Sequence, residues 1–371
     1  HPHDSICGCS TDGVHRDMET RFAGVRRTAE QSIAKLLDRR VPMFAPTEAD
    51  DRATVIAVAN PLPMVRDEVI DRLVVLQPLD YDLSRLRLRD EQGRDVPFTI
   101  VKKRYLERFW GIDYRQELTC DRQLALLDTY LRRFGDRIIG TEDDRATHDC
   151  FLHLRFLARD LPAVGHARFF LDDDGDGSRA APDHPVRAAS GSESATIENE
   201  HLTATLFPDG TFNLLDRATG RDYAGLNLLE DAEDCGDEYD YSPAEGNAMF
   251  FSAGAPGKVK IVQADALAAV AEASFRFDLP RSLERDRQSR NPKTTPCDVT
   301  VRLTLRAGAR RVDVATEFNN RAFDHRLRAW FPTGLATDTV TADGHFMLNE
   351  RPVVRPSNED WDQPAPPTWP Q

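Results

Sequence analysis

The first ten residues, His-Pro-His-Asp-Ser-Ile-Cys-Gly-Cys-Ser, place an imidazole, a carboxylate and two thiols directly before a predicted helix. His3 and Asp4 offer one ring nitrogen and one carboxylate oxygen, which are ligand types that zinc accepts. Zinc is usually held by three or four such groups, so this pair supplies at most part of a metal site. A second interpretation is also open: His3 and Asp4 only form hydrogen bonds around the start of the helix.

A second group of side chains that could take part in catalysis or binding lies in residues 235–243. Their sequence, Cys-Gly-Asp-Glu-Tyr-Asp-Tyr-Ser-Pro, contains three acids and two tyrosines. Paired carboxylates serve as acid and nucleophile in sugar hydrolysis, where their separation of roughly 5 Å or more sets the stereochemical course. Tyrosines such as Tyr239 and Tyr241 can stack on sugars or form hydrogen bonds with them. The alternative is a turn whose acids are solvated.

An acidic segment, residues 172–183, has the spacing of a calcium-binding loop. Positions one, three, five, six and twelve of that pattern are filled by Asp172, Asp174, Asp176, Gly177 and Asp183. A strand-like run precedes the segment, where a calcium-binding helix–loop–helix unit has a helix. Because an acidic run rich in Ser, Gly and Pro is also typical of a linker, both interpretations are open.

The charge and the apolar content of the sequence disfavour two classes of binding partner, nucleic acids and membranes. The chain of 371 residues has 48 basic and 62 acidic residues and a formal charge of -14, which disfavours nucleic acid. No apolar run approaches the roughly 20 residues of a membrane helix, and no signal-peptide pattern follows the first residue. We therefore expect neither a nucleic-acid nor a membrane partner.

Six cysteines occur without a Cys-x-x-Cys pair or a dense spacing. This pattern indicates free thiols and neither a zinc ribbon nor a disulfide framework. It favours a reducing compartment, and we expect a cytoplasmic protein. A pairing of Cys120 with Cys150 stays open.

One long amphipathic helix is predicted from about residue 11 to Arg40. Ser10 or Thr11 can cap it, and Val41-Pro42 ends it. Its apolar positions are spaced by three or four residues: Val14, Met18, Phe22, Val25, Ala29, Ile33 and Leu36. A stripe this regular packs either on the sheet that follows or within a bundle of helices.

Short β-rich runs separated by turn residues follow the helix, a pattern typical of an antiparallel β-sandwich. These runs are residues 54–58, 72–76, 96–101 and 151–156. Residues 121–134 interrupt them with apolar positions at helical spacing and Gly135 as a stop, which predicts a helical insertion. His153 alternates with apolar neighbours and is most simply a strand residue.

A second β domain begins near Ile197. Residues 202–206 and 212–215 flank Asp209-Gly210 and predict a hairpin. Residues 299–305 and 312–318 alternate apolar and polar side chains, which indicates one buried face and one solvated face.

Two stretches resemble a known family. The start of the chain, continued through T-D-G-V-H-R-D-M-E-T-R-F to residue 22, resembles the class II α-mannosidases, glycoside hydrolase family 38. Residues 319–334, N-N-R-A-F-D-H-R-L-R-A-W-F-P-T-G, are similar to a hallmark of that family's large C-terminal sandwich. The resemblance covers nearly all of the chain.

The resemblance implies a role for three residues. It implies that His3 is a zinc ligand and that Asp4 contacts sugar hydroxyls. In the family a tyrosine of the second β domain contacts the substrate, and we assign Tyr239 to that position. The family's nucleophile and remaining zinc ligands belong to a catalytic α/β-barrel domain that is missing from this chain, so no catalytic residue is assigned here.

We therefore predict a mainly β chain with a long N-terminal α-helix, a β-sandwich with a helical insertion, and part of a large, galactose mutarotase-like β-supersandwich. The expected domains are the last helix of a central helical domain (1–40), a first β-sandwich with its insertion near 121–134 (41–178), a linker (179–194) and a truncated second sandwich (195–371). The expected function is that of the C-terminal portion of a zinc-dependent retaining α-mannosidase, inactive alone, whose partners are an α-mannoside and the missing catalytic domain. The alternative is a non-catalytic module that binds carbohydrate or holds domains together.

Overall fold

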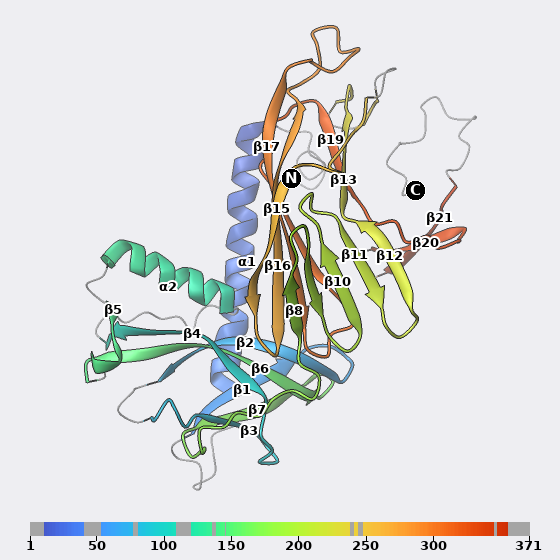
Figure 1. Ribbon diagram of the computed structural model, residues 1–371. Coiled ribbons are helices and arrows are strands. Elements are labelled where there is room, and N and C mark those ends of the chain that lie inside the picture. Colours follow the sequence, from blue (N-terminus) through green and yellow to red (C-terminus); the bar gives the residue numbers. More distant parts are fainter. Residues whose placement is uncertain are drawn as a thin grey trace.

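The computed structural model describes residues 11–40, 53–76, 81–108, 120–135, 139–144, 146–237, 241–243, 248–344 and 347–354. Within these ranges the chain has two α-helices and twenty-one strands (Figure 1). A short 3-10 helix, Glu142–Asp144, is also present. The chain is mainly β, which confirms the predicted fold class.

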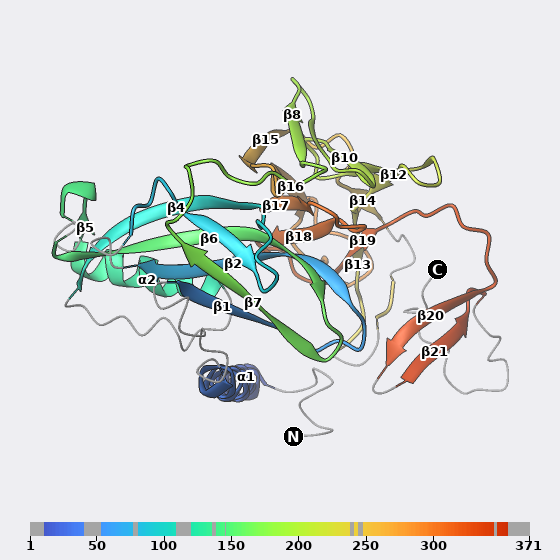
Figure 2. The ribbon, with the colours of Figure 1, turned by 90° about the horizontal axis from the view of Figure 1, so that it is seen from below.

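The N-terminal helix α1 (Asp12–Arg40) begins and ends close to the predicted residues. It lies along the outside of the molecule (Figures 1 and 2). Its apolar stripe is largely exposed, with Val25 at 69% and Leu36 at 61%, whereas Ala34 is buried. An ion pair between Glu30 and Arg122 joins it to the second helix. The apolar stripe is therefore not packed on the sheet that follows.

The first β domain consists of two antiparallel sheets. One has the order β1-β7-β3, formed by β1 (Thr54–Asn60), β7 (Gly165–Asp172) and β3 (Arg87–Asp90). The other has the order β2-β6-β4-β5, formed by β2 (Arg66–Leu76), β6 (His148–Leu161), β4 (Phe98–Glu107) and β5 (Ile139–Gly140). Apolar side chains of both sheets share one core, including Ile56, Leu88, Leu154, Phe156, Phe169 and Leu171. The two sheets therefore pack face to face, as in a sandwich.

The opposite face of β6 is covered by two different neighbours. At one end, Phe151 and Leu73 pack under helix α2 (Cys120–Phe134), the predicted insertion. The helix ends at Gly135, whose φ of 64° is the left-handed conformation of a glycine C-cap. At the other end, Leu157 and Val69 belong to the core of the second β domain. The sheet face thus joins the two β domains.

The second β domain has three sheets and a separate hairpin. The five-stranded sheet β12-β11-β10-β9-β8 is formed by β8 (Arg187–Ser190), β9 (Ala195–Glu198), β10 (Leu202–Leu206), β11 (Phe212–Asp216) and β12 (Arg221–Leu226). The four-stranded sheet β15-β16-β17-β18 is formed by β15 (Gly257–Ala264), β16 (Ala268–Pro280), β17 (Thr294–Arg306) and β18 (Asp313–Phe318). The sheet β14-β13-β19 is formed by β14 (Phe250–Phe251), β13 (Leu228–Glu233) and β19 (His325–Trp330). Strands β20 (Thr339–Gly344) and β21 (Met347–Pro352) pair only with each other. Strand β8 lies within the residues expected to form a linker.

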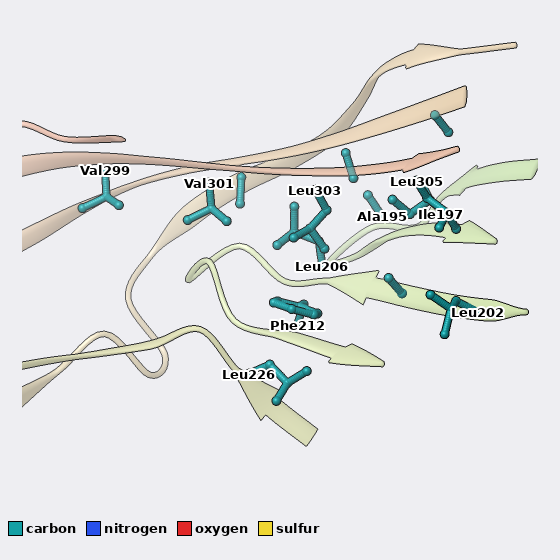
Figure 3. Close-up of a cluster of buried hydrophobic side chains, with 14 of the residues drawn as sticks. Ala195, Ile197, Leu202, Leu206, Phe212, Leu226, Val299, Val301, Leu303 and Leu305 are labelled. Atoms are coloured by element: carbon teal, nitrogen blue, oxygen red, sulfur yellow. The ribbon is translucent and has the colours of Figure 1, made fainter. Parts of the chain in front are cut away.

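Alternating side chains of the larger sheets form the core of this domain (Figure 3). Val299, Val301, Leu303 and Leu305 of β17 are all buried, as the sequence pattern predicts. They face Ile197, Leu206 and Phe212 from the five-stranded sheet. Burying such aliphatic and aromatic side chains contributes about 1.5–3 kcal/mol each.

The predicted hairpin around Asp209-Gly210 is present between β10 and β11. Asp209 Oδ1 accepts hydrogen bonds from the backbone N–H of Thr211 (3.0 Å) and from its hydroxyl (2.7 Å). Gly210 has a φ of 81°, and a Cβ at this position would lie 2.7 Å from the ring of Phe275. The turn therefore needs glycine for both its conformation and its close packing.

Cys120 and Cys150 are buried free thiols, so the pairing that the sequence left open does not occur. Neither described helix is long and apolar enough to cross a membrane.

Candidate functional site

The three residues assigned from the family resemblance, His3, Asp4 and Tyr239, lie outside the described residues. Their roles stay predictions. Both ends of the loop that carries Tyr239, here called the Tyr239 loop (residues 234–243), are described. Together with the sheet β14-β13-β19, these ends form the candidate site.

The two ends of the Tyr239 loop are tied to each other. Cys235 N–H donates to the carbonyl of Ser242 at 2.7 Å. Asp234 Oδ1 accepts from the backbone N–H of Gly236 (2.9 Å) and of Ser242 (3.0 Å). At the second end, the guanidinium carbon of Arg326 lies 3.4 Å from the ring centroid of Tyr241. The loop therefore starts and ends at fixed positions beside β13 and β19.

Two side chains of the loop, Cys235 and Tyr241, are poor nucleophiles in this setting. Burial, together with the negative charge of Glu233, raises the pKa of the Cys235 thiol, and its Sγ donates to the carbonyl of Arg287 at 3.1 Å. Burial also raises the pKa of the Tyr241 phenol. Both groups keep their protons at neutral pH, so they can donate hydrogen bonds but do not supply an anion.

Strand β13 carries three carboxylates that are almost completely buried. Glu230, Asp231 and Glu233 are 3%, 0% and 1% exposed. A buried carboxylate is costly unless charged partners and hydrogen bonds compensate for the loss of water. The partners of Glu230 and Asp231 show how this cost is met.

Asp231 faces the core and has two basic partners. It accepts from Arg290 Nη2 at 2.6 Å and from His325 Nδ1. His325 Nε2 lies 3.0 Å from Asn320 Oδ1, an oxygen that also accepts the backbone N–H of Ala322. Both ring nitrogens of His325 thus lie against side-chain oxygens. The resulting network ties β13, β19 and the loop between β16 and β17 together.

Glu230 points to the opposite face of the sheet. Its Oε1 accepts from Arg328 Nε at 3.0 Å and also from Arg328 Nη2, and its Oε2 accepts from Trp330 Nε1 at 2.8 Å. Arg328 in turn lies over the ring of Trp330, with 4.9 Å between the guanidinium carbon and the ring centroid. Glu230 therefore fixes the orientation of both side chains.

Several buried polar atoms in this region have no hydrogen-bond partner among the described residues. They are Oε1 of Glu233, Nε and Nη1 of Arg290, and Nε of Arg326. The guanidinium of Arg290 lies 5.5 Å from the ring centroid of Phe250, a cation–π contact that partly replaces hydrogen bonds. Buried polar atoms without a partner are rare in folded proteins, so each of these calls for a specific explanation.

Two of the buried carboxylates, Glu230 and Asp231, hold the structure of the site together. Glu230 binds Arg328 and Asp231 binds Arg290, so the oxygens of both carboxylates are engaged in contacts within the sheet region. The sequence predicted the Tyr239 loop but not this support. The acids within the apolar run Leu-Leu-Glu-Asp-Ala-Glu were the available signal, whereas nothing in the sequence pointed to Arg290 as their partner.

The four aspartates of the possible calcium loop have protein partners, and Asp172 and Asp174 share Arg89. Asp172 binds Arg89, and Asp183 lies 2.8 Å from Arg159. Asp176 Oδ1 accepts from the backbone N–H of Ser178 at 2.8 Å. Asp174 lies 3.7 Å from Arg87. Across the described ranges, no group of three or more His, Cys, Asp or Glu side chains is arranged to hold a metal ion. The choice between a calcium loop and a linker, which the sequence left open, stays open.

A cavity of about 620 Å³ lies away from the Tyr239 loop, in the first β domain. Its walls carry paired charges, including Arg168 with Glu91 at 2.6 Å and Arg159 with Asp183. These pairs satisfy one another, so the cavity points to no ligand of particular chemistry.

Comparison with known proteins shows which family the second β domain resembles. Residues 197–368 match the model of the glycosyl hydrolases family 38 C-terminal domain. A protein of Halalkalibacterium halodurans, provisionally named a mannosylglycerate hydrolase, is 25% identical over 379 residues, which cover 98% of this chain and 40% of that protein.

Two crystal structures from Enterococcus faecalis have the same fold. A protein in glycosyl hydrolase family 38 matches with a TM-score of 0.72 and 21% identity, over 95% of this chain and 41% of that one. An α-mannosidase of strain V583 matches with a TM-score of 0.71 and 20% identity, over 98% and 40%. The chain spans about two fifths of the length of these relatives. Residues 197–368, in its second β domain, are similar to the C-terminal domain of the family 38 glycoside hydrolases.

Proposed function

We propose that this chain is the C-terminal portion of a zinc-dependent retaining α-mannosidase. The observation that carries the proposal is the family 38 C-terminal domain at residues 197–368. The relatives that match nearly the whole chain include one named an α-mannosidase and one provisionally named a mannosylglycerate hydrolase. Both names describe mannose-containing substrates, so an α-mannoside is the substrate class we assign.

In this proposal His3 is a zinc ligand and Asp4 binds sugar hydroxyls. An imidazole and a carboxylate are donors that zinc accepts, but a catalytic zinc usually has three protein ligands. The donor set of this pair therefore fits zinc and is incomplete. When bound, zinc would supply a positive charge that holds two sugar hydroxyls. Tyr239 would lie at the rim of the same site, where its hydroxyl can donate to the substrate.

The nucleophile and the proton donor are assigned to a separate barrel domain. Retaining hydrolysis needs one carboxylate free to attack the anomeric carbon and a second to protonate the leaving oxygen. Glu230 and Asp231 are held by arginines and are committed to positioning the sheet under the Tyr239 loop. This commitment supports the proposed division of labour between the domains.

The exposed stripe of α1 supports the same arrangement. Phe22, Val25 and Leu36 are each more than half exposed, although their spacing is that of a helix face that packs against other helices. We assign α1 to a helical domain whose remaining helices would cover this stripe.

The test uses a protein that carries this chain together with the upstream domains. It should hydrolyse an aryl α-mannoside and lose activity when zinc is removed. His3→Ala should remove most of the activity, with partial recovery in excess zinc, because one metal ligand is lost. Asp4→Asn should retain the metal and lower turnover by about 10² fold. Asp12→Asn, an exposed acid at the start of α1, is the matched control.

Metal content and kcat are measured for each variant. Zinc-independent hydrolysis, or full activity in His3→Ala, would contradict the proposed roles.

A non-catalytic carbohydrate-binding or structural module is the second candidate. The observation that favours it is an exposed aromatic residue, Phe251, on the same sheet face as Trp330. Saccharide binding without hydrolysis in the longer protein would support this alternative.

A further inference from the structure

The outward face of the sheet β14-β13-β19 carries aromatic rings and guanidinium groups in adjacent rows. Phe251 pairs with Glu230, and Glu230 pairs with Arg328 on its other side. Residues paired directly across strands point to the same face. Trp330 and Arg326 lie two positions away along β19, so they share this face. The opposite face, which includes Leu229, Phe250 and Leu327, packs into the core.

The rings of this face are partly open to solvent. Phe251 is 47% exposed and Trp330 is half-buried. The side chain of Arg328 is 32% exposed, while its partner Glu230 is buried. The carboxylate of Glu230 therefore lies beneath the surface, whereas the aromatic rings and the guanidinium of Arg328 lie at the surface.

The support also fixes the geometry of the face. Glu230 binds Trp330 Nε1 and the guanidinium of Arg328, so neither ring nor guanidinium is free to turn. Arg326, stacked on Tyr241, extends the row to the end of the Tyr239 loop. A binding site whose flat groups are held before the ligand arrives loses less entropy on binding.

These groups match the two kinds of surface that a sugar ring presents. Its C–H face is apolar and packs on an aromatic ring, and its hydroxyls accept hydrogen bonds from an arginine. An apolar helix would be a poor match, because it would bury the guanidinium of Arg328 without supplying an acceptor beyond Glu230.

We propose that the outward face of this sheet, centred on Phe251 and Trp330, binds a saccharide unit of the substrate beyond the bond that is cleaved. This proposal rests on the proposed function, because the Tyr239 loop at its edge is assigned to the rim of the catalytic site. It adds a subsite, formed by residues of this chain, for a second saccharide unit of the substrate.

The test measures saccharide binding by the purified chain, by NMR titration and tryptophan fluorescence. The probes are α-1,2-mannobiose, methyl α-mannoside and cellobiose. Mannobiose should bind more tightly than the other two probes. Phe251→Ala should weaken its binding by about tenfold, the effect of one aromatic contact. Trp330→Phe retains a ring but loses the bond to Glu230, and it should weaken binding by a smaller factor.

Phe22→Ala is the matched control, because Phe22 is an exposed aromatic residue on α1. Its affinity for mannobiose should equal that of the unmodified chain. Circular dichroism of each variant shows whether the fold is retained; Phe251 is exposed enough that its truncation should leave the fold intact.

The outcomes separate this proposal from the proposed function. Equal affinity in Phe251→Ala and the unmodified chain, or no binding of any probe, would overturn the saccharide face and leave α-mannoside hydrolysis by the longer protein untouched. Binding of cellobiose in preference to mannobiose, with the same loss in Phe251→Ala, would support the face and contradict the assignment of α-mannosides as substrates.

Discussion

Asp231 and its partners show how single residues make a buried acidic strand possible. The Asp231 carboxylate is fully buried, and the side chains of Arg290 and His325 beside it are each 5% exposed. Removing such charges from water costs several kcal/mol per ion, which close pairing offsets. Removing one of these partners of Asp231 should therefore have a large effect on the free energy of unfolding.

Arg290→Met should lower the free energy of unfolding by about 3–5 kcal/mol, because it leaves the Asp231 carboxylate buried with one partner fewer. Urea denaturation of the purified chain measures this. The control is Arg276→Met, which removes an exposed ion pair with Asp278 and should cost about 0–1 kcal/mol. An equal loss in both variants would show that Asp231 does not depend on Arg290.

Among the elements, β2 and β6 join the two β domains through one polar network. Asp71 Oδ1 accepts from His153 Nε2 at 2.7 Å and from Arg155 Nε at 2.9 Å. Arg155 Nη1 also donates to Asp265 Oδ2 at 2.9 Å, in the turn between β15 and β16. The same sheet face contributes Val69 and Leu157 to the core of the second domain. Polar and apolar contacts thus act together at this junction.

The network predicts a pH dependence of stability. Burial alone would raise the pKa of Asp71, but the hydrogen bond from His153 and the charge and hydrogen bond of Arg155 lower it overall. A carboxyl group with a lowered folded pKa stabilises the fold above its unfolded pKa of about 3.9. That contribution is lost as the pH falls through the lower folded pKa.

Asp71→Asn should therefore lower the urea midpoint at pH 6 and reduce its further fall below about pH 4. The control is Asp278→Asn, an exposed acid whose curve should parallel that of the unmodified chain. If the urea midpoints of all three proteins coincided at every pH, Asp71 would not contribute to stability in acid.

Elements with a strong local signal were predictable from the sequence. The bounds of α1 and α2 follow from apolar spacing and from Gly135, and the β10–β11 hairpin follows from Asp209-Gly210. Strand β8 was not predicted, because Arg187–Ser190 has few apolar residues and gains its structure by pairing with β9. Pairing between distant segments leaves little trace in local sequence.

The candidate site was predictable only in part, for the same reason. The acids and tyrosines of residues 235–243 identified the loop. Arg290, the partner of the buried Asp231 in the neighbouring strand β13, is 59 residues from Asp231 in the sequence. The rows of Phe251 and Trp330 likewise come from strands that only the register of β13 brings together.

At the scale of the whole molecule, the two β domains form a scaffold, and α1 leaves an apolar stripe uncovered. The scaffold holds both ends of the Tyr239 loop and the outward face of β14-β13-β19 in fixed positions. In our proposal the reactive carboxylates come from another domain, and this chain contributes His3, Asp4 and Tyr239 at its boundary. The chain alone should therefore bind saccharide without cleaving it.

Turnover of an aryl α-mannoside by the purified 371-residue chain, beside a protein that also carries the upstream barrel, tests this division most directly. We predict no hydrolysis by the chain after contaminating hydrolases are removed, and zinc-dependent hydrolysis by the longer protein. Hydrolysis by the chain alone, abolished by substituting an acid of the Tyr239 loop such as Asp237→Asn, would contradict the account and locate a complete catalytic site within these residues.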